Sequence, residues 1–126
     1  MRTLIVFLLI GLSTGSSWAS VREERSQLAA YGTAYCMSRL GSDPIRAEAD
    51  MAMNGYVQLS SYESEHAYRA VRRHIDQAVP DPVPVYQTNG KAAVLMVCLS
   101  LGQRPDFLKL VRQQDRHLPS RTQKLR

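Results

Sequence analysis

Histidines are the side chains of this sequence best suited to catalysis or metal binding, and their spacing argues against both. His66 and His74 are eight residues apart on one expected helix, which turns by about 800° over that distance and leaves the two rings roughly 80° apart. His117 lies near the end of the chain. The sequence contains no glycine-rich phosphate loop and no G-x-S-x-G, H-E-x-x-H or C-x-x-C motif. We therefore expect a protein that is not an enzyme and that uses no metal ion or cofactor.

The N-terminus, residues 1–19, has the form of a signal peptide. Arg2 precedes an apolar run at Leu4–Leu12, and Ser17-Trp18-Ala19 places small residues where a signal peptidase cuts. The apolar run is too short to span a bilayer, and no later segment resembles a membrane span. We expect cleavage after Ala19, export to the periplasm and no membrane attachment of the mature chain.

The two cysteines, Cys36 and Cys98, are expected to pair. Disulfides persist outside the inner membrane, and neither cysteine has a histidine near it in the sequence. Closing the 62-residue separation would stabilise the fold by roughly 4 kcal/mol on the chain-entropy model. A reactive free thiol is the alternative.

Basic residues accumulate at the C-terminal end of the chain. Seven lysines and arginines follow from Arg104 onward, against two aspartates. In a cytosolic protein this would suggest nucleic-acid binding, but export argues against it. We expect a helical domain at residues 20–117 followed by a solvated basic tail at 118–126.

The apolar spacing predicts an all-α fold. Lys91–Leu101 is the most apolar run of the mature chain and is apolar on every side, so we expect it to be a buried central helix. Gly32, inside the first helix, is expected to allow a neighbouring helix to approach closely. The prediction is a compact bundle of about five helices around the central one, with one intrachain disulfide. The expected helices are 20–40, 42–59, 62–79, 91–101 and 105–117.

Residues 80–90, PDPVPVYQTNG, form the one long connection that the sequence predicts. Three prolines within five residues prevent a helix and hold the backbone extended. Val83, Val85 and Tyr86 are apolar residues on this segment. The loop could therefore enter a groove of another protein with little loss of entropy, or it could lie on its own domain.

Three segments resemble the periplasmic immunity proteins for type VI secretion amidase effectors. They are Tyr31–Cys36 (YGTAYC), Gly55–Gln58 followed by Ser61-Tyr62, and Met96–Leu99. The resemblance covers roughly residues 28–115. It implies a helical homodimer in the periplasm of a bacterium that injects a papain-like cysteine amidase into its neighbours. That toxin cuts peptide stems of peptidoglycan, and the immunity protein occludes its active-site groove.

In the family that the chain resembles, a protruding loop and a nearby helix from the other subunit form the inhibitory surface. By position these would be Asp81–Asn89 and Tyr62–Val79. The loop would fill a cleft built for a peptide, with Tyr86 as its anchor, and arginines of the helix would match charge at the rim. The candidate partner-binding residues are Val83, Val85, Tyr86, Gln87, Tyr62, Arg69, Arg72 and Arg73.

Two other functions fit an exported helical protein with one disulfide. A small periplasmic chaperone of the acid-stress kind would expose apolar surface at low pH. An inhibitor of another wall hydrolase, such as a lysozyme, would act by the same kind of occlusion.

Overall fold

Five α-helices and one short 3-10 helix account for most of residues 17–120, the part of the chain that the computed structural model describes. The predicted signal peptide therefore lies almost wholly outside the described residues, as do residues 121–126 of the predicted tail. The prediction of an all-α fold is confirmed. The elements are α1 (Ser17–Leu40), α2 (Asp43–Leu59), α3 (His66–Ala78), α4 (Val94–Gly102), α5 (Pro105–Gln113) and η1 (Gln114–His117).

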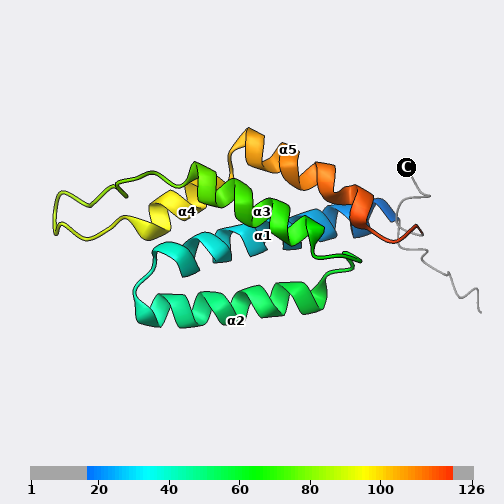
Figure 1. Ribbon diagram of the computed structural model, residues 1–126, viewed down its shortest axis with the longest axis horizontal. Helices are drawn as coiled ribbons and strands as arrows, with labels where there is room; N and C mark the ends of the chain where they lie inside the picture. The colour runs from blue at the N-terminus through cyan, green and yellow to red at the C-terminus, as the bar shows by residue number, and fades with distance from the viewer. Residues whose placement is uncertain (1–16, 121–126) are drawn as a thin grey trace, which may run out of the picture.

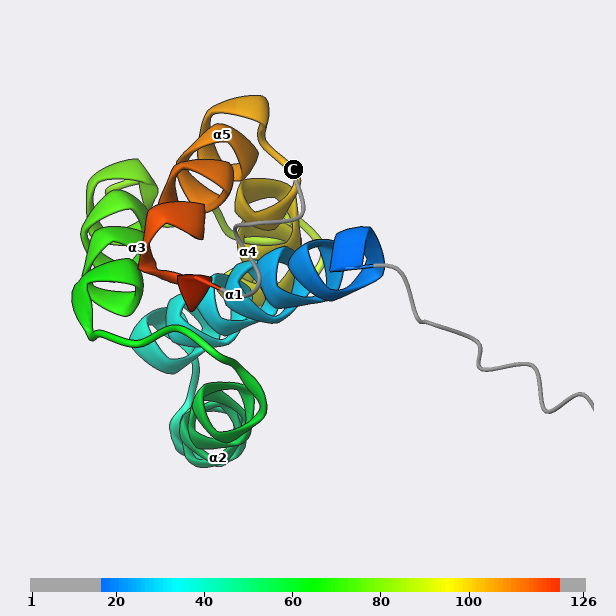
Figure 2. The same cartoon turned by 90° about the vertical axis from the view of Figure 1, so that its right-hand side faces the viewer.

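The long helix α1 is the element on which the others pack. α2, α3, α4 and α5 all contact it, with α2 along one side and α3, α4 and α5 around the others (Figures 1 and 2). Gly32 lies at a close approach of three helices, because a Cβ atom there would come 2.6 Å from Phe107 Cζ and 2.9 Å from Val71 Cγ1. The expected close approach at Gly32 is confirmed, and it involves both α3 and α5.

The prediction of a buried central helix at residues 91–101 is wrong. The helix begins only at Val94, and Leu95, Met96 and Leu99 are 57%, 51% and 47% exposed. A nine-residue helix at the side of the bundle can bury only the face that it turns toward α1, here Val97, Cys98 and Leu101. α1 takes the central place because its 24 residues run the length of the domain.

The third helix starts four residues later than predicted. The S-x-x-E sequence from Ser60 to Glu63 is typical of a capping box, but the backbone N–H groups of Ser61 and Glu63 bond distant groups. Ser61 N donates to Glu24 Oε2 over 2.9 Å, and Glu63 N donates to the carbonyl oxygen of His117 over 2.9 Å. The Ser60 hydroxyl bonds the hydroxyl of Tyr68 instead. Residues 60–65 therefore form a connection held to α1 and η1.

The other helix boundaries agree with the sequence, with one correction at the C-terminal end. α2 continues through Asn54-Gly55 as expected, and α5 begins at Pro105 as expected and passes into η1. Leu118, which we placed in the solvated tail, is buried in the core. Among the described residues, no helix is both long and apolar enough to cross a bilayer.

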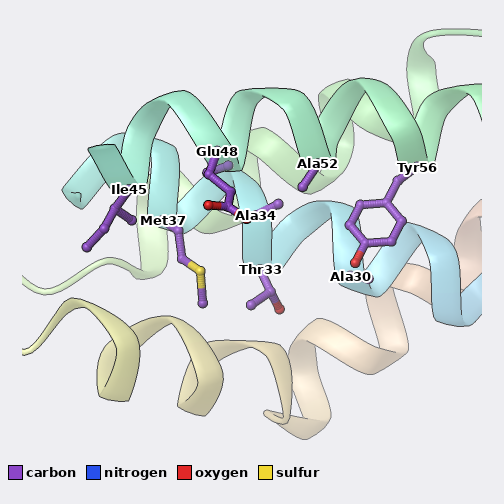
Figure 3. A pocket seen from close by; sticks show the side chains of 9 residues that line it. Ala30, Thr33, Ala34, Met37, Ile45, Glu48, Ala52 and Tyr56 are labelled. Carbon is purple, nitrogen blue, oxygen red and sulfur yellow. The ribbon is translucent and has the colours of Figure 1, made fainter. Parts of the chain in front are cut away.

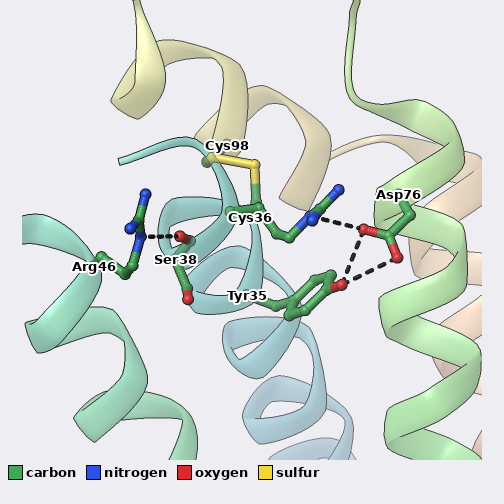
Figure 4. A network of polar contacts seen from close by, with 7 residues as sticks. Tyr35, Cys36, Ser38, Arg46, Asp76 and Cys98 are labelled. Atoms are coloured by element: carbon green, nitrogen blue, oxygen red, sulfur yellow. Dashed lines mark hydrogen bonds and ion pairs between the residues drawn. A yellow bond between two sulfur atoms is a disulfide. The ribbon is translucent and has the colours of Figure 1, made fainter. Parts of the chain in front are cut away.

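The disulfide prediction is confirmed. Cys36 of α1 and Cys98 of α4 are bonded, with an S–S distance of 2.08 Å and a Cα–Cα distance of 5.5 Å. Both side chains are fully buried. The bond fixes α4, the helix that follows the long loop, to the central helix α1 (Figure 4).

Candidate partner-binding site

The connection between α3 and α4 projects from one end of the bundle (Figure 1). It is an ordered hairpin, although its sequence predicts only an extended chain. Val85 and Ala92 form an antiparallel bridge, Tyr86 N donates to Lys91 O over 2.9 Å, and Ala93 N donates to Pro84 O over 2.8 Å. The peptide bond between Asp81 and Pro82 is cis. The loop thus has a paired stem.

A tight turn closes the tip of the hairpin. Gly90 N donates to Tyr86 O over 2.8 Å, and Gly90 has φ +67°, a left-handed conformation that glycine adopts without steric cost. Asn89 Oδ1 accepts a hydrogen bond from Lys91 N over 2.9 Å. The side chain of Asn89 therefore stabilises this turn. These bonds hold Tyr86 in a fixed position at the start of the turn.

Both helices that carry the loop are attached to the C-terminal half of α1 near the loop base. On α3, Asp76 Oδ1 accepts a hydrogen bond from the Tyr35 hydroxyl over 2.9 Å and pairs with Arg39 Nε at 3.1 Å (Figure 4). On α4, Cys98 is bonded to Cys36. Burial, together with the hydrogen bond to Asp76, raises the pKa of Tyr35 and keeps it a donor. Arg72, four residues before Asp76 on α3, bonds Tyr31 instead of Asp76, and α1 supplies the partners of Asp76.

Apolar side chains are exposed on the loop and on the neighbouring helix. Val85, Tyr86 and Gln87 are exposed, whereas Val83 is partly buried against the core. The three half-exposed side chains of α4 described above lie next to them in the chain. Sequence analysis missed this second apolar face. The signal was available, because a helix that is apolar on every side cannot bury every side in a domain of this size.

Tyr62 is misassigned as a partner-binding residue. Its side chain is in the core, 9% exposed, and its ring lies edge-on to that of Tyr68 with centroids 6.1 Å apart. Its hydroxyl is buried without a hydrogen-bond partner among the described residues. Burial, with Asp115 and Glu24 adding negative charge nearby, raises the pKa of Tyr62 well above its usual value. The side chain cannot contact another protein in this conformation.

The structure does not place the three candidate arginines beside the loop. Arg72 Nη1 donates to the Tyr31 hydroxyl over 2.7 Å, and Arg69 pairs with Glu65 at 3.6 Å. Arg69 precedes Ala78 by nine residues, roughly 14 Å along the helix axis, so it lies toward the far end of α3. Arg69 and Arg73 line a different pocket.

Another apolar surface lies along α1 and α2. It is a groove of about 490 Å³ whose lining side chains point into it from both helices (Figure 3). Most of them are apolar, with Glu48 and Thr33 as the polar exceptions. The groove is lined by Ala30, Thr33, Ala34, Met37, Ile45, Glu48, Ala49, Ala52 and Tyr56.

The described residues contain no group of three or more His, Cys, Asp or Glu side chains that could hold a metal ion. Comparisons of the chain with family models, with curated proteins and with solved structures gave no match. The geometry of the loop and the surfaces beside it is therefore the basis for assigning a function.

Proposed function

We propose that this protein is a periplasmic immunity protein that binds a type VI secreted peptidoglycan amidase and occludes its active site. The observation that carries the proposal is the hairpin between α3 and α4. It projects from the bundle, its backbone is paired, and it carries exposed Val85 and Tyr86 near its tip. A papain-like amidase has a groove built for an extended peptide, and a hairpin with these properties fits such a groove.

The braced loop would bind with a small entropic cost. Its stem is closed by backbone hydrogen bonds, and its two carrier helices are fixed to α1 by Asp76 and by the disulfide. A segment that is already ordered loses little freedom on binding, so more of the contact energy appears as affinity. Tyr86 would be the central anchor, since exposed aromatic side chains dominate many interfaces. Inhibition needs no chemistry by this protein.

The apolar face of α4 would extend the contact beside the loop. Leu95 and Leu99 are one helical turn apart and Met96 lies between them, so they form one patch. Burying the exposed part of these apolar side chains against a partner would lower the free energy. The rim of the amidase groove is the surface that an inserted loop brings closest to them.

We further propose that the protein is a homodimer and that the groove along α1 and α2 is its contact surface. The lining is mostly apolar, and Ile45, at one end of it, is exposed. Replacing Ala52 with arginine would fill the groove with a charged side chain. We expect light scattering to give a dimer mass for the native chain and a monomer mass for Ala52→Arg, with inhibition reduced in the monomer if both subunits contact the toxin.

The test is inhibition of a secreted cysteine amidase encoded next to this gene. The native protein should co-purify with that amidase and abolish cleavage of peptidoglycan stems. Val85→Ala with Tyr86→Ala should weaken inhibition strongly, whereas the matched change Val57→Ala with Leu59→Ala, on exposed positions of α2, should not. Full inhibition by the loop variant would exclude the loop as the inhibitory segment, and inhibition of a lysozyme without effect on the amidase would exclude the proposed target.

The second candidate function is a small periplasmic chaperone of the acid-stress kind. Exposed apolar side chains on α2, among them Met51 and Leu59, favour it, because such proteins bind unfolded clients through apolar surface. A chaperone should bind an apolar dye more strongly on acidification and should suppress aggregation of unrelated proteins. An immunity protein should do neither at the concentrations that inhibit the amidase.

A further inference from the structure

A second pocket lies between α3 and η1, toward the end of the bundle opposite the loop. Its volume is about 350 Å³. Among the described residues that line it, each ionisable side chain is an arginine or a histidine, and none is a carboxylate. The lining residues are His66, Arg69, Ala70, Arg73, Gln114, Arg116 and His117. Such a pocket attracts an anion.

Among the described residues, carboxylates compensate only part of the positive charge of Arg69 and Arg73. Glu65 pairs with Arg69 at 3.6 Å, but both side chains are largely exposed and such pairs are weak. Asp115 is buried in a pair with Arg25 of α1. Arg73 has no ion pair or hydrogen bond with any described residue. Its guanidinium group can therefore turn toward a bound anion without breaking a contact.

The two histidines show the same excess of positive charge. The rings of His66 and His117 are stacked, with centroids 5.6 Å apart, and Arg116 Nε donates to His117 Nε2 over 3.3 Å. Burial, then the charge of Arg116 and then His66, lower the pKa of His117. A bound anion would offset the charge of Arg116 and favour the protonated form of His117.

Gln114 distinguishes among anions. Its side chain is buried, Nε2 donates to Leu110 O over 3.1 Å, and Oε1 has no hydrogen-bond partner among the described residues. A buried acceptor without a donor costs free energy. Phosphate and its monoesters can carry a P–OH group that donates a hydrogen bond, whereas sulfate and carboxylate at neutral pH carry only acceptors.

We propose that the pocket between α3 and η1 binds a phosphate group, either as the free ion or as a monoester. Guanidinium groups match phosphate oxygens with paired N–H donors, and donors here come from two elements. A phosphate offers more oxygens and more charge than the single carboxylate that one arginine would satisfy. Gln114 Oε1 would accept the proton of the P–OH group. The site is separate from the loop and does not depend on the proposed function.

The test follows the histidine ring signals of the full chain by NMR during titration with inorganic phosphate. Sodium chloride holds the ionic strength constant, and sulfate serves as the competing anion. We expect saturable shifts at His66 and His117, a higher pKa for His117 with phosphate bound, and weaker binding of sulfate. Shifts that chloride alone reproduces would overturn the site, and equal affinity for sulfate would overturn the assignment to phosphate.

Two charge-matched variants separate the pocket from general charge effects. Arg73→Gln should weaken phosphate binding about ten-fold, the usual effect of one charged hydrogen bond. Arg112→Gln removes the same charge from an exposed position of α5 outside the lining and should leave binding unchanged. Equal effects of the two variants would overturn the proposal. Arg73 is exposed, so the variant should fold as the native chain does, which its thermal unfolding would check.

Vesicles distinguish the two sources of the phosphate. Vesicles of phosphatidylcholine with phosphatidic acid present a phosphate monoester, and vesicles of phosphatidylcholine alone do not. Binding to the former that inorganic phosphate competes away, and that Arg73→Gln loses, identifies a lipid monoester as the ligand. Phosphate binding without vesicle binding identifies the free ion.

Discussion

The helices at the loop end of the bundle are joined by a covalent bond as well as polar contacts, whereas those at the other end are joined by hydrogen bonds and an ion pair. At the loop end, the disulfide joins α1 to α4, Asp76 joins α3 to α1, and apolar side chains of the loop and α4 remain exposed. At the other end the contacts are polar: Arg25 Nε donates to Asp115 Oδ1 over 3.0 Å, and buried Glu24 accepts a hydrogen bond from Ser61 N. Reduction should therefore affect mainly the loop end, and removal of a charged side chain mainly the other end.

This difference separates the proposed roles. The loop end combines a covalent brace with unburied apolar surface, which suits tight contact with another protein. The α3–η1 end combines buried charges with a basic pocket, which suits a small anion. Changes at one end should therefore leave the properties of the other end largely intact.

Removal of the disulfide should have the largest effect. Cys36→Ala with Cys98→Ala should lower the free energy of unfolding by up to about 4 kcal/mol, because the unfolded chain regains the freedom of a 62-residue loop. Urea unfolding measures this loss. Amide exchange should accelerate at Tyr86 and Ala93 more than at Ser61 and Glu63. Equal acceleration at both ends would show that the bond stabilises the whole domain without bracing the loop.

The elements that could be predicted from sequence are those with local signals. A proline marks the start of α2 and of α5, and the glycine at position 32 marks a close helix contact. Each could be predicted because it acts within a few residues or through one contact. The cysteine pairing followed from there being only two. The hairpin stem was not predictable, since its proline-rich sequence indicates extension but not which residues pair.

The polar end gave no comparable signal in the sequence. Ser61 N bonds Glu24, and Glu63 N bonds His117, so each contact joins residues 37 or 54 positions apart. Nothing in a local window distinguishes Ser60 and Glu63 from a capping box. The position of Tyr62 in the core follows from the same contacts. Apolar content alone also misplaced α4, because burial depends on how many neighbours a helix has.

A substitution of Asp115, at the end opposite the loop, should cause the next largest loss in the free energy of unfolding. Asp115→Asn keeps the volume but leaves Arg25 without its charged partner, and we expect a loss of about 2 to 3 kcal/mol, below the full cost of breaking a buried pair because Arg25 reaches solvent. Asp43→Asn, which disrupts an exposed pair with Arg46, is the control and should change stability little. Asp115→Asn should leave amidase inhibition intact. A loss of inhibition would show that the two ends are coupled.

A substitution on the exposed face of α4 should affect partner binding more than stability. Leu99→Gln should cost about 1 kcal/mol or less in stability, because the side chain is already half exposed, yet it should weaken partner binding about ten-fold. Val97→Ala, on the buried face of the same helix, should reduce stability more and partner binding less. Calorimetry with the amidase and urea unfolding measure the two effects. If Leu99→Gln binds as the native chain does, α4 lies outside the interface.

The smallest expected effect is the dependence of the free energy of unfolding on pH that His117 causes. Its pKa is lower in the folded chain than its ordinary value of 6.5, so the unfolded chain binds the proton more readily. The stability that this group contributes is complete above pH 6.5 and is lost as pH falls through the folded pKa. Unfolding at about pH 7.5 and at about pH 5.5 should show a greater loss for the native chain than for His117→Gln. Phosphate should reduce that loss in the native chain, since a bound anion favours the protonated ring, and an equal loss in both proteins would place the pH sensitivity elsewhere.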